Sequence, residues 1–199
     1  MNFIQKLIFN GEIPYFNVLK NILRFVPFLW ILILLYPKYY VEIWDLGWYC
    51  LLFIVFSRPL SDVLPKLGIL KKFVALRKEI WIISWIFIVA HWLWFFLASK
   101  ISVFTGLSSG DYYNLTNLFG WGMIGMYIGI ILTITSNKFS KKLLGRNWKR
   151  LQRFTYLFFI FWAIHIAFFD PEKILPLLMV VGLWAVLWIL AWKRVVLLK

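Results

Sequence analysis

Two histidines are the residues of this chain whose type and setting most directly suggest chemistry. His91 lies in the apolar stretch WIISWIFIVAHWLWFFLASK, His165 lies in YLFFIFWAIHIAFF, and the chain has 2 histidines in all. Ionisable side chains are rare inside membrane-spanning helices and mark functional sites there. Such an imidazole can bind a metal ion, or it can stay neutral and hydrogen bond to a backbone carbonyl or to a serine such as Ser84. For a lone histidine both alternatives are open.

The spacing of the two histidines favours a shared metal. His91 follows Ile80 by eleven residues, and His165 follows Phe154, the start of its own apolar stretch, by eleven residues as well. At a rise of about 1.5 Å per residue, both rings lie roughly 16 Å from the same membrane boundary if the two helices run in parallel. Two imidazoles at one level suit the two axial positions of one haem iron. The matched depths therefore predict one haem held between His91 and His165.

Aromatic and small residues surround these positions. Residues three or four apart share a helical face, so aromatic side chains at that spacing can form the wall of an apolar macrocycle. Those near His91 are Phe87, Trp94 and Phe95, and those near His165 are Phe161, Trp162 and Phe169. The stretch GWGMIGMYIGI places Gly122, Gly125 and Gly129 near one face, which predicts close helix packing more than direct contact with a cofactor.

The composition predicts the elements that carry the two histidines. The chain has 199 residues, of which 63% are hydrophobic and 21% aromatic, and this favours an integral membrane protein. The formal net charge is +14, but the basic residues cluster between apolar runs, so a nucleic-acid partner is not expected. The single cysteine, Cys50, lies in an apolar run and is interpreted as a buried structural thiol.

Six apolar runs predict six transmembrane helices, because a spanning helix needs about 17–25 apolar residues. The runs cover residues 21–37, 43–60, 80–98, 118–136, 154–169 and 174–192. We therefore expect an all-α, six-helix bundle over residues 21–192, preceded by an amphipathic N-terminal lead at 1–20 and followed by a short cytoplasmic tail at 193–199. The second run has only a short apolar core, because Asp45 and Arg58 bracket it, and the fifth reaches spanning length only if its helix continues back through the basic segment before it.

The distribution of lysine and arginine predicts the orientation. With a cytoplasmic N-terminus, 19 of the 22 basic residues fall in segments on the inner side. The outer segments then hold Lys38, Lys100 and Lys173. This agrees with the positive-inside rule at every loop, so both termini are expected to be cytoplasmic, in a multi-pass protein of the inner or plasma membrane.

The loops between these runs are too short for a nucleotide-binding domain. The sequence shows no glycine-rich phosphate loop, no Cys–His metal cluster and no hydrolase-like triad. Any chemistry must therefore use the membrane helices or a separate partner protein.

The order and spacing of four stretches resemble a known family. These stretches are VPFLWILILLY, FSRPLSDVL, ALRKEIWIISWIFIVAHWLWFFL and KKLLGRNWKRLQRFTYLFFIFWAIHIAFF. They resemble the haem-binding membrane subunit of methionine-sulfoxide reductase systems (the MsrQ/YedZ family), within the ferric-reductase-like transmembrane domain superfamily. The most specific part is the pattern LG-x-x-W-x-x-L-[HQ]-x-x-x-Y that leads to His165.

The resemblance implies six helices, haem b, and His91 and His165 as the iron ligands. It also implies electron transfer from a cytoplasmic flavin reductase or a quinol to an extracytoplasmic reductase, which in the methionine-sulfoxide system contains molybdopterin. The chain would then be an electron-transfer component of an oxidoreductase and not a complete enzyme.

Gln152 departs from the pattern of this family, which usually has a third histidine at that place. Thirteen residues separate Gln152 from His165, or about 20 Å along a helix, close to the separation needed for a second haem. Glutamine is a poor iron ligand, so the sequence predicts one haem. A flavin such as FMN at the cytoplasmic face could replace the inner haem, with Gln152, Trp148, Arg153 and Arg77 as weak candidates to bind it. For the arginines, contact with lipid headgroups is the alternative.

Two alternative functions are compatible with the same sequence. The chain could be the membrane component of a ferric or other metal-ion reductase, although its relatives of that kind usually carry a flavin and nicotinamide domain. It could also be a degenerate membrane protein that keeps the fold without redox activity, an interpretation to which the glutamine at 152 contributes.

Overall fold

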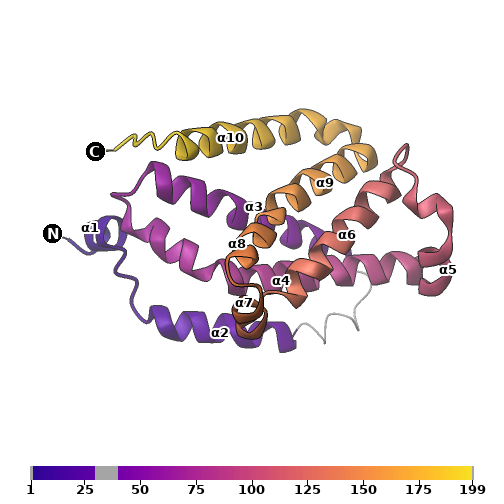
Figure 1. Ribbon diagram of the computed structural model, residues 1–199, viewed down its shortest axis with the longest axis horizontal. Coiled ribbons are helices and arrows are strands. Elements are labelled where there is room, and N and C mark those ends of the chain that lie inside the picture. Colours follow the sequence, from indigo (N-terminus) through magenta and orange to yellow (C-terminus); the bar gives the residue numbers. More distant parts are fainter. Residues whose placement is uncertain (1, 30–39, 199) are drawn as a thin grey trace. The chain divides into compact units, whose positions relative to one another are not determined.

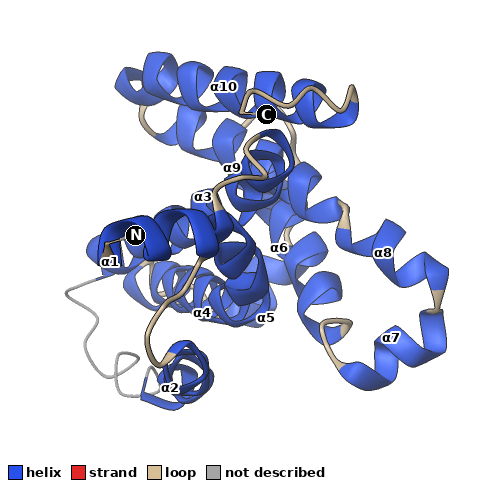
Figure 2. Cartoon of the chain, turned by 90° about the vertical axis from the view of Figure 1, so that its left-hand side faces the viewer, coloured by secondary structure: helices blue, strands red, loops and turns tan. Residues whose placement is uncertain are grey.

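The computed structural model describes residues 2–29 and 40–198, and all of the regular structure in these ranges is helical (Figures 1 and 2). The prediction of an all-α protein is therefore confirmed for the described part of the chain. The expected first span, residues 21–37, lies partly outside the described residues. Its first nine residues belong to helix α2 (Phe16–Leu29).

Four helical segments of the described chain are long and apolar enough to cross a membrane. They are Trp44–Val63 in α3 (Tyr40–Val63), Gly68–Ala98 (α4), Arg146–Phe169 and Pro171–Trp192. The third of these combines α8 (Arg146–Gln152) with α9 (Phe154–Phe169), and the fourth contains α10 (Ile174–Trp192). A fifth span is obtained if α6 (Leu118–Ile134) and α7 (Lys138–Leu144), which meet at a bend of 94°, are counted as one. The expectation of several membrane helices is thus confirmed, with four to five candidate spans in the described residues where the sequence predicted six in the whole chain.

Polar side chains begin these helices where the sequence changes from loop to apolar run. The Asn117 side chain accepts hydrogen bonds from the backbone N–H groups of Phe119 and Gly120, at 3.0 and 3.3 Å, and so caps α6. Asn137 caps α7 in the same way. Such caps satisfy N–H groups that have no partner within the helix. Gly145, with φ +50°, separates α7 from α8, a conformation that glycine adopts without a steric penalty.

The chain divides into two compact units. The first comprises Met1–His91 with Leu183–Lys199. It contains α1 (Phe3–Gln5), a π-helical turn (Lys6–Asn10), α2, α3 and α4 as far as His91. Its core includes Leu51, Val55 and Val63 of α3 and Ser84 of α4, whose exposed fractions are all 0%.

An ion-pair cluster joins α2 to α4 in this unit. The Glu79 side chain is 4% exposed, and its Oε1 atom lies 3.3 Å from Arg24 Nε and 3.9 Å from Lys20 Nζ. Lys20 and Arg24 are four residues apart and share one face of α2. This face therefore carries the charges that hold α2 to the buried carboxylate.

The second unit, Trp92–Gly182, contains α5 (Val103–Ser108), a 3-10 turn (Gly110–Tyr113), α6 to α9, and a second 3-10 turn (Pro171–Lys173). Helices α6 and α9 pack along each other and form its main interface. Leu132 of α6 and Phe158 and Phe159 of α9 are all 0% exposed. Histidine 165 lies on the α9 side of this interface.

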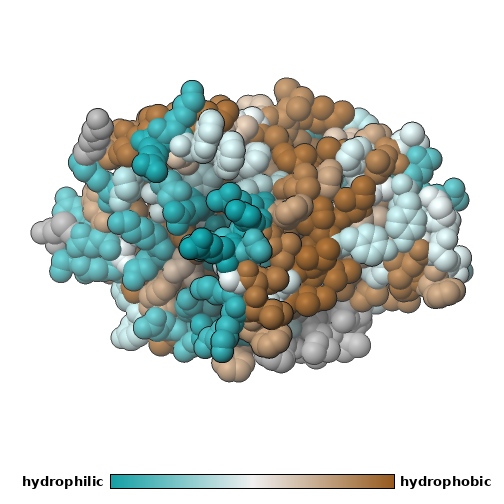
Figure 3. All heavy atoms as spheres, viewed as in Figure 1, coloured by the Kyte–Doolittle hydropathy of each residue, from teal (hydrophilic) through white to brown (hydrophobic). Residues whose placement is uncertain are grey.

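Large apolar side chains are exposed on the surface, most of all on α10. Leu175, Met179 and Trp192 are 69%, 68% and 72% exposed. Broad apolar patches are visible on the face shown in Figure 3. Exposed apolar area on this scale is typical of a surface that contacts lipid chains.

Candidate functional site

His91 lies on α4 in the first unit and faces α3. Its imidazole ring is 4.2 Å from the ring of Trp44 on α3, measured between centroids, and the two planes meet at 64°. His91 is half-buried, and its Nδ1 atom is fully buried. An edge-to-face contact of this kind is favourable and restricts the rotation of both rings. Trp44 therefore orients the imidazole of His91.

A close approach of α3 and α4 supports this contact. The Ser84 hydroxyl donates a hydrogen bond to the backbone carbonyl of Gly47, at 3.0 Å. A Cβ atom placed on Gly47 would lie 3.1 Å from Phe87 Cβ, so glycine is what lets the helices come this near. Ser84, Phe87 and His91 recur at helical spacing and share the face of α4 that meets α3. The sequence suggests Ser84 as an alternative hydrogen-bond partner of a histidine. In the structure, its hydroxyl donates to the Gly47 carbonyl of α3 instead.

His165 lies on α9 in the second unit and faces α6 at a glycine. A Cβ atom placed on Gly122 would lie 2.9 Å from His165 Nδ1 and 3.0 Å from Cε1. The imidazole thus lies where any other residue at position 122 would put its side chain. Gly125, one turn further along α6, lies near Phe158 and Phe161 of α9. The prediction of close helix packing is confirmed at Gly122, whereas a Cβ atom on Gly125 would make only ordinary contacts, at 3.9 Å or more.

The contacts of the two rings are compatible with iron ligation. A histidine that ligates iron commonly uses one ring nitrogen for the metal, while the protein holds the other. In His165 the Nδ1–Cε1 edge lies against Gly122, and in His91 Nδ1 is the buried nitrogen. In both cases the protein lies close to Nδ1. Each imidazole, taken within its own unit, therefore has a residue type and a setting that fit a haem ligand.

The aromatic residues expected around the histidines differ in burial. Phe87 is 3% exposed and Trp162 is 4% exposed, and the Trp162 ring lies 6.2 Å from His165. Phe161 lies 5.6 Å from the ring of Trp121. Phe169 is 70% exposed at the end of α9, so it covers no part of the buried interior.

Phe95 belongs to an aromatic cluster in the second unit. Its ring lies 5.3 Å from Phe96, 6.4 Å from Tyr112 and 5.3 Å from Phe119. Phe96 is 1% exposed and occupies the space beside Gly106 of α5. This cluster joins the end of α4 to the start of α6 and keeps water out of that region.

Gln152 and Trp148, the candidates for an inner cofactor site, both bind the end of α6. The Gln152 amide donates to Thr135 Oγ1 at 3.2 Å and to the Leu132 carbonyl at 3.5 Å. The Trp148 indole N–H donates to the Thr135 carbonyl at 2.8 Å, and Lys141 Nζ lies 5.5 Å from the centre of the Trp148 ring. The last carbonyls of a helix lack intrahelical donors, and the Trp148 indole supplies one to the carbonyl of Thr135.

The two arginine candidates have different surroundings. Arg77 lies on α4 in the first unit with a buried Nε atom, and Arg153 is exposed at the junction of α8 and α9. Among the described residues, no group of three or more His, Cys, Asp or Glu side chains could hold a metal ion. A haem with two histidine ligands does not require such a group.

Sequence reasoning missed Trp44 and Glu79. Trp44 is separated from His91 by most of two helices, so their contact depends on the register of α3 against α4, which no local pattern reveals. Glu79 did have a sequence signal, because it is an acidic residue at the edge of the apolar run that begins at Ile80. A buried acidic residue there needs a partner of opposite charge, which the structure identifies as Arg24 with Lys20.

Together these features define a helical, multi-pass membrane protein with two imidazoles held at helix interfaces. The chain is similar to the protein-methionine-sulfoxide reductase heme-binding subunit MsrQ of Agrobacterium fabrum, with 27% identity over 128 residues. The similarity covers 64% of this chain and 55% of the relative, so the chain spans about half the length of the curated relative that it matches. No protein-family profile matches the chain. No solved structure matches it either.

Proposed function

We propose that the chain is a haem b-binding electron-transfer subunit of the MsrQ/YedZ family, with His91 and His165 as the axial ligands of one haem. The observation that carries the proposal is the seat of His165, whose ring lies against Gly122 in space that any side chain would fill. The similarity to the haem-binding subunit MsrQ supports the same assignment. When bound, haem supplies reversible one-electron redox chemistry at its iron.

The residues of the chain hold and shield that group. Trp44 and Gly122 fix the orientation of the two imidazoles, each from a neighbouring helix. Phe87 and Trp162 are buried beside them and exclude water. Because protein side chains fill both axial positions in this proposal, the site is suited to electron transfer and not to binding of a small molecule at the metal.

We place both termini in the cytoplasm and count six spans over residues 21–192. The electron donor is then a cytoplasmic flavin reductase or a quinol, and the acceptor is an extracytoplasmic reductase. The acceptor docks at the segments of residues 99–117 and 170–175, which lie on the outer side in this orientation. The commitment of Gln152 and Trp148 to the end of α6 supports a single haem, because both side chains already have structural partners.

The test is spectroscopic. The protein is produced in membranes with haem supplied and purified, and its oxidised and dithionite-reduced spectra are recorded beside those of His91→Ala and His165→Ala. We expect a low-spin b-type spectrum, about one haem per chain, and its loss in both variants. Wild-type protein without haem would favour the degenerate alternative, and two haems per chain would contradict the assignment of Gln152.

A further inference from the structure

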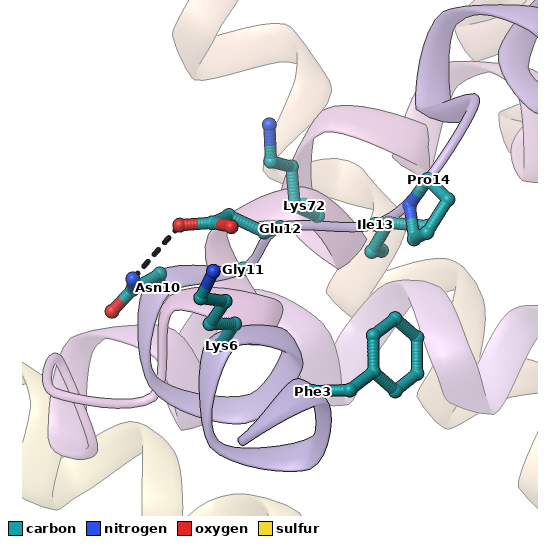
Figure 4. Close-up of a pocket in the computed structure, with 8 residues that line it drawn as sticks. All are labelled: Phe3, Lys6, Asn10, Gly11, Glu12, Ile13, Pro14 and Lys72. Carbon is teal, nitrogen blue, oxygen red and sulfur yellow. Dashed lines mark hydrogen bonds between the residues drawn. The ribbon is translucent and has the colours of Figure 1, made fainter. Parts of the chain in front are cut away.

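A cavity lies between the N-terminal segment, residues 3–14, and the start of α4. Neither histidine lines it. Its volume is about 540 Å³, and it opens to the surface, because most of the residues that line it are exposed. Figure 4 shows its lining, in which Lys6, Asn10 and Glu12 come from the N-terminal segment and Lys72 comes from α4. Nothing in the proposed electron-transfer function uses this cavity.

Two glycines fix the walls of the cavity against each other. Gly11 has φ +67°, and a Cβ atom on it would lie 2.5 Å from the carbonyl oxygen of Gly68. A Cβ atom on Gly68 would in turn meet the carbonyl oxygen of Phe9. The backbone of the N-terminal segment therefore rests directly on the first residue of α4. This contact brings the segment that carries Lys6 to the start of the helix that carries Lys72.

The polar lining has an excess of positive charge. It carries the ammonium groups of Lys6 and Lys72 and the carboxylate of Glu12. One oxygen of that carboxylate accepts a hydrogen bond from the Asn10 amide at 2.9 Å. Lys72 Nζ also lies 4.9 Å from the centre of the Phe16 ring, which holds the amine at the cavity without neutralising it. Two amines on separate elements suit the oxygens of a phosphate group.

The apolar part of the lining indicates which kind of phosphate-bearing molecule fits the cavity. Phe3, Ile13 and Pro14 complete the cavity, which favours a ligand with an apolar part beside the phosphate. The surrounding N-terminal segment also exposes large apolar side chains next to its lysines. Those in α1, the π-helical turn and α2 include Ile4 (62%), Phe9 (50%), Val18 (53%), Ile22 (55%) and Phe25 (68%). Segments with this composition lie in the membrane interface, at the level of lipid headgroups.

We propose that this cavity binds the headgroup of an anionic phospholipid. Lys6 and Lys72 contact the phosphate oxygens, and Phe3, Ile13 and Pro14 contact the glycerol and the first methylene groups. The lipid would join the N-terminal segment to α4 through its phosphate, in addition to the contact between Gly11 and Gly68. The proposal is independent of haem binding.

The experiment measures retention of phosphatidylglycerol by full-length protein in detergent, using native mass spectrometry over a lipid titration. The variants are the double variant Lys6→Ala/Lys72→Ala and the control Lys71→Ala, which removes an exposed charge from the same helix. Each lysine near an anionic lipid surface contributes about 1 kcal/mol, so the double variant should bind the lipid at least about tenfold more weakly. The control should bind as wild type does.

Three results would overturn the proposal. One is wild-type retention by the double variant, and another is an equal loss in the Lys71→Ala control, which would mean unspecific charge attraction. The third is displacement of the lipid by millimolar inorganic phosphate, which would assign the cavity to free phosphate. The circular-dichroism spectrum and the size-exclusion profile of the double variant show whether it folds as the wild type does, and a variant that does not fold is replaced by Lys6→Gln/Lys72→Gln.

Discussion

Gly122 is the residue on which the position of His165 depends. The nearest atoms to a Cβ at this position belong to the imidazole ring, at 2.9 and 3.0 Å, and real Cβ atoms essentially never come closer than 3.0 Å. A ring that ligates iron cannot move aside without changing the angle at which its nitrogen meets the metal. Glycine at 122 therefore acts on the metal through the histidine and is a positioning residue.

Gly122→Ala should displace the ring of His165 by a few tenths of an ångström and weaken its bond to iron. We expect haem content to fall several-fold, or the reduced spectrum to change from low-spin to high-spin. The matched control is Gly182→Ala, because a Cβ atom at Gly182 in α10 meets nothing within 4 Å. A normal low-spin spectrum at full haem content in Gly122→Ala would show that His165 does not ligate iron in this orientation.

Gln152 shows where sequence reasoning about a residue stops. Its type and spacing indicate what it cannot do, because an amide does not replace imidazole as a haem ligand. They give no sign of what it does do. The structure shows that its amide donates hydrogen bonds to Thr135 and Leu132 at the end of α6. In the chain, a sharp bend and α7 separate the end of α6 from Gln152. A contact made through such a bend depends on the geometry of three helices and leaves no periodic pattern in the sequence.

At the scale of elements, α2 is attached to α4 by charge. Glu79 is buried, whereas Arg24 is 58% exposed, so the pair combines a desolvated carboxylate with a cation that water can still reach. Exposure of one partner screens the attraction and limits the pair to about 1 kcal/mol or less. The ion pairs therefore add only a small free energy to the packing of α2 against α4.

Glu79→Gln keeps the size of the side chain and removes its charge, so Lys20 and Arg24 lose their counterion. We expect trypsin to cleave after these two residues up to about fivefold faster, because cleavage requires α2 to open. Asp62→Asn is the control, since Arg58 and Asp62 form an exposed pair within α3 at 2.9 Å. Unchanged cleavage in Glu79→Gln would mean that apolar contacts alone hold α2.

The long helices of the described residues could be predicted from the sequence. The runs at 43–60, 80–98, 118–136, 154–169 and 174–192 correspond to α3, α4, α6, α9 and α10. Hydropathy did not reveal that α4 continues back to Gly68, because residues such as Lys71, Lys72 and Arg77 form helix readily without being apolar. The two histidines could be identified from their type and setting. Their contacts with Trp44 and Gly122 could not, because these depend on helix register.

At the scale of the whole molecule, the distribution of basic residues makes a prediction about sidedness. In a background with Cys50→Ser, we expect Ser109→Cys to react with a membrane-impermeant maleimide added to intact cells. Ser140→Cys, which lies in α7 beside Lys141 and Lys142, should react only after permeabilisation. Labelling in the opposite order would reverse the proposed orientation, and equal labelling of both sites would place α6 outside the set of spanning helices.

The exposed apolar surface of α10 has a consequence for how the chain can vary. Leu178 and Leu183 are 63% and 56% exposed, so no packed neighbour constrains their shape. Lipid chains accept leucine, isoleucine, valine and methionine almost equally. In a library of all single substitutions, α10 should therefore tolerate exchange among these four residues, while Gly47 and Gly122 should tolerate almost none. The sequence would then evolve at two rates. Positions that face lipid would change quickly, and positions where two helices touch through a glycine would change slowly.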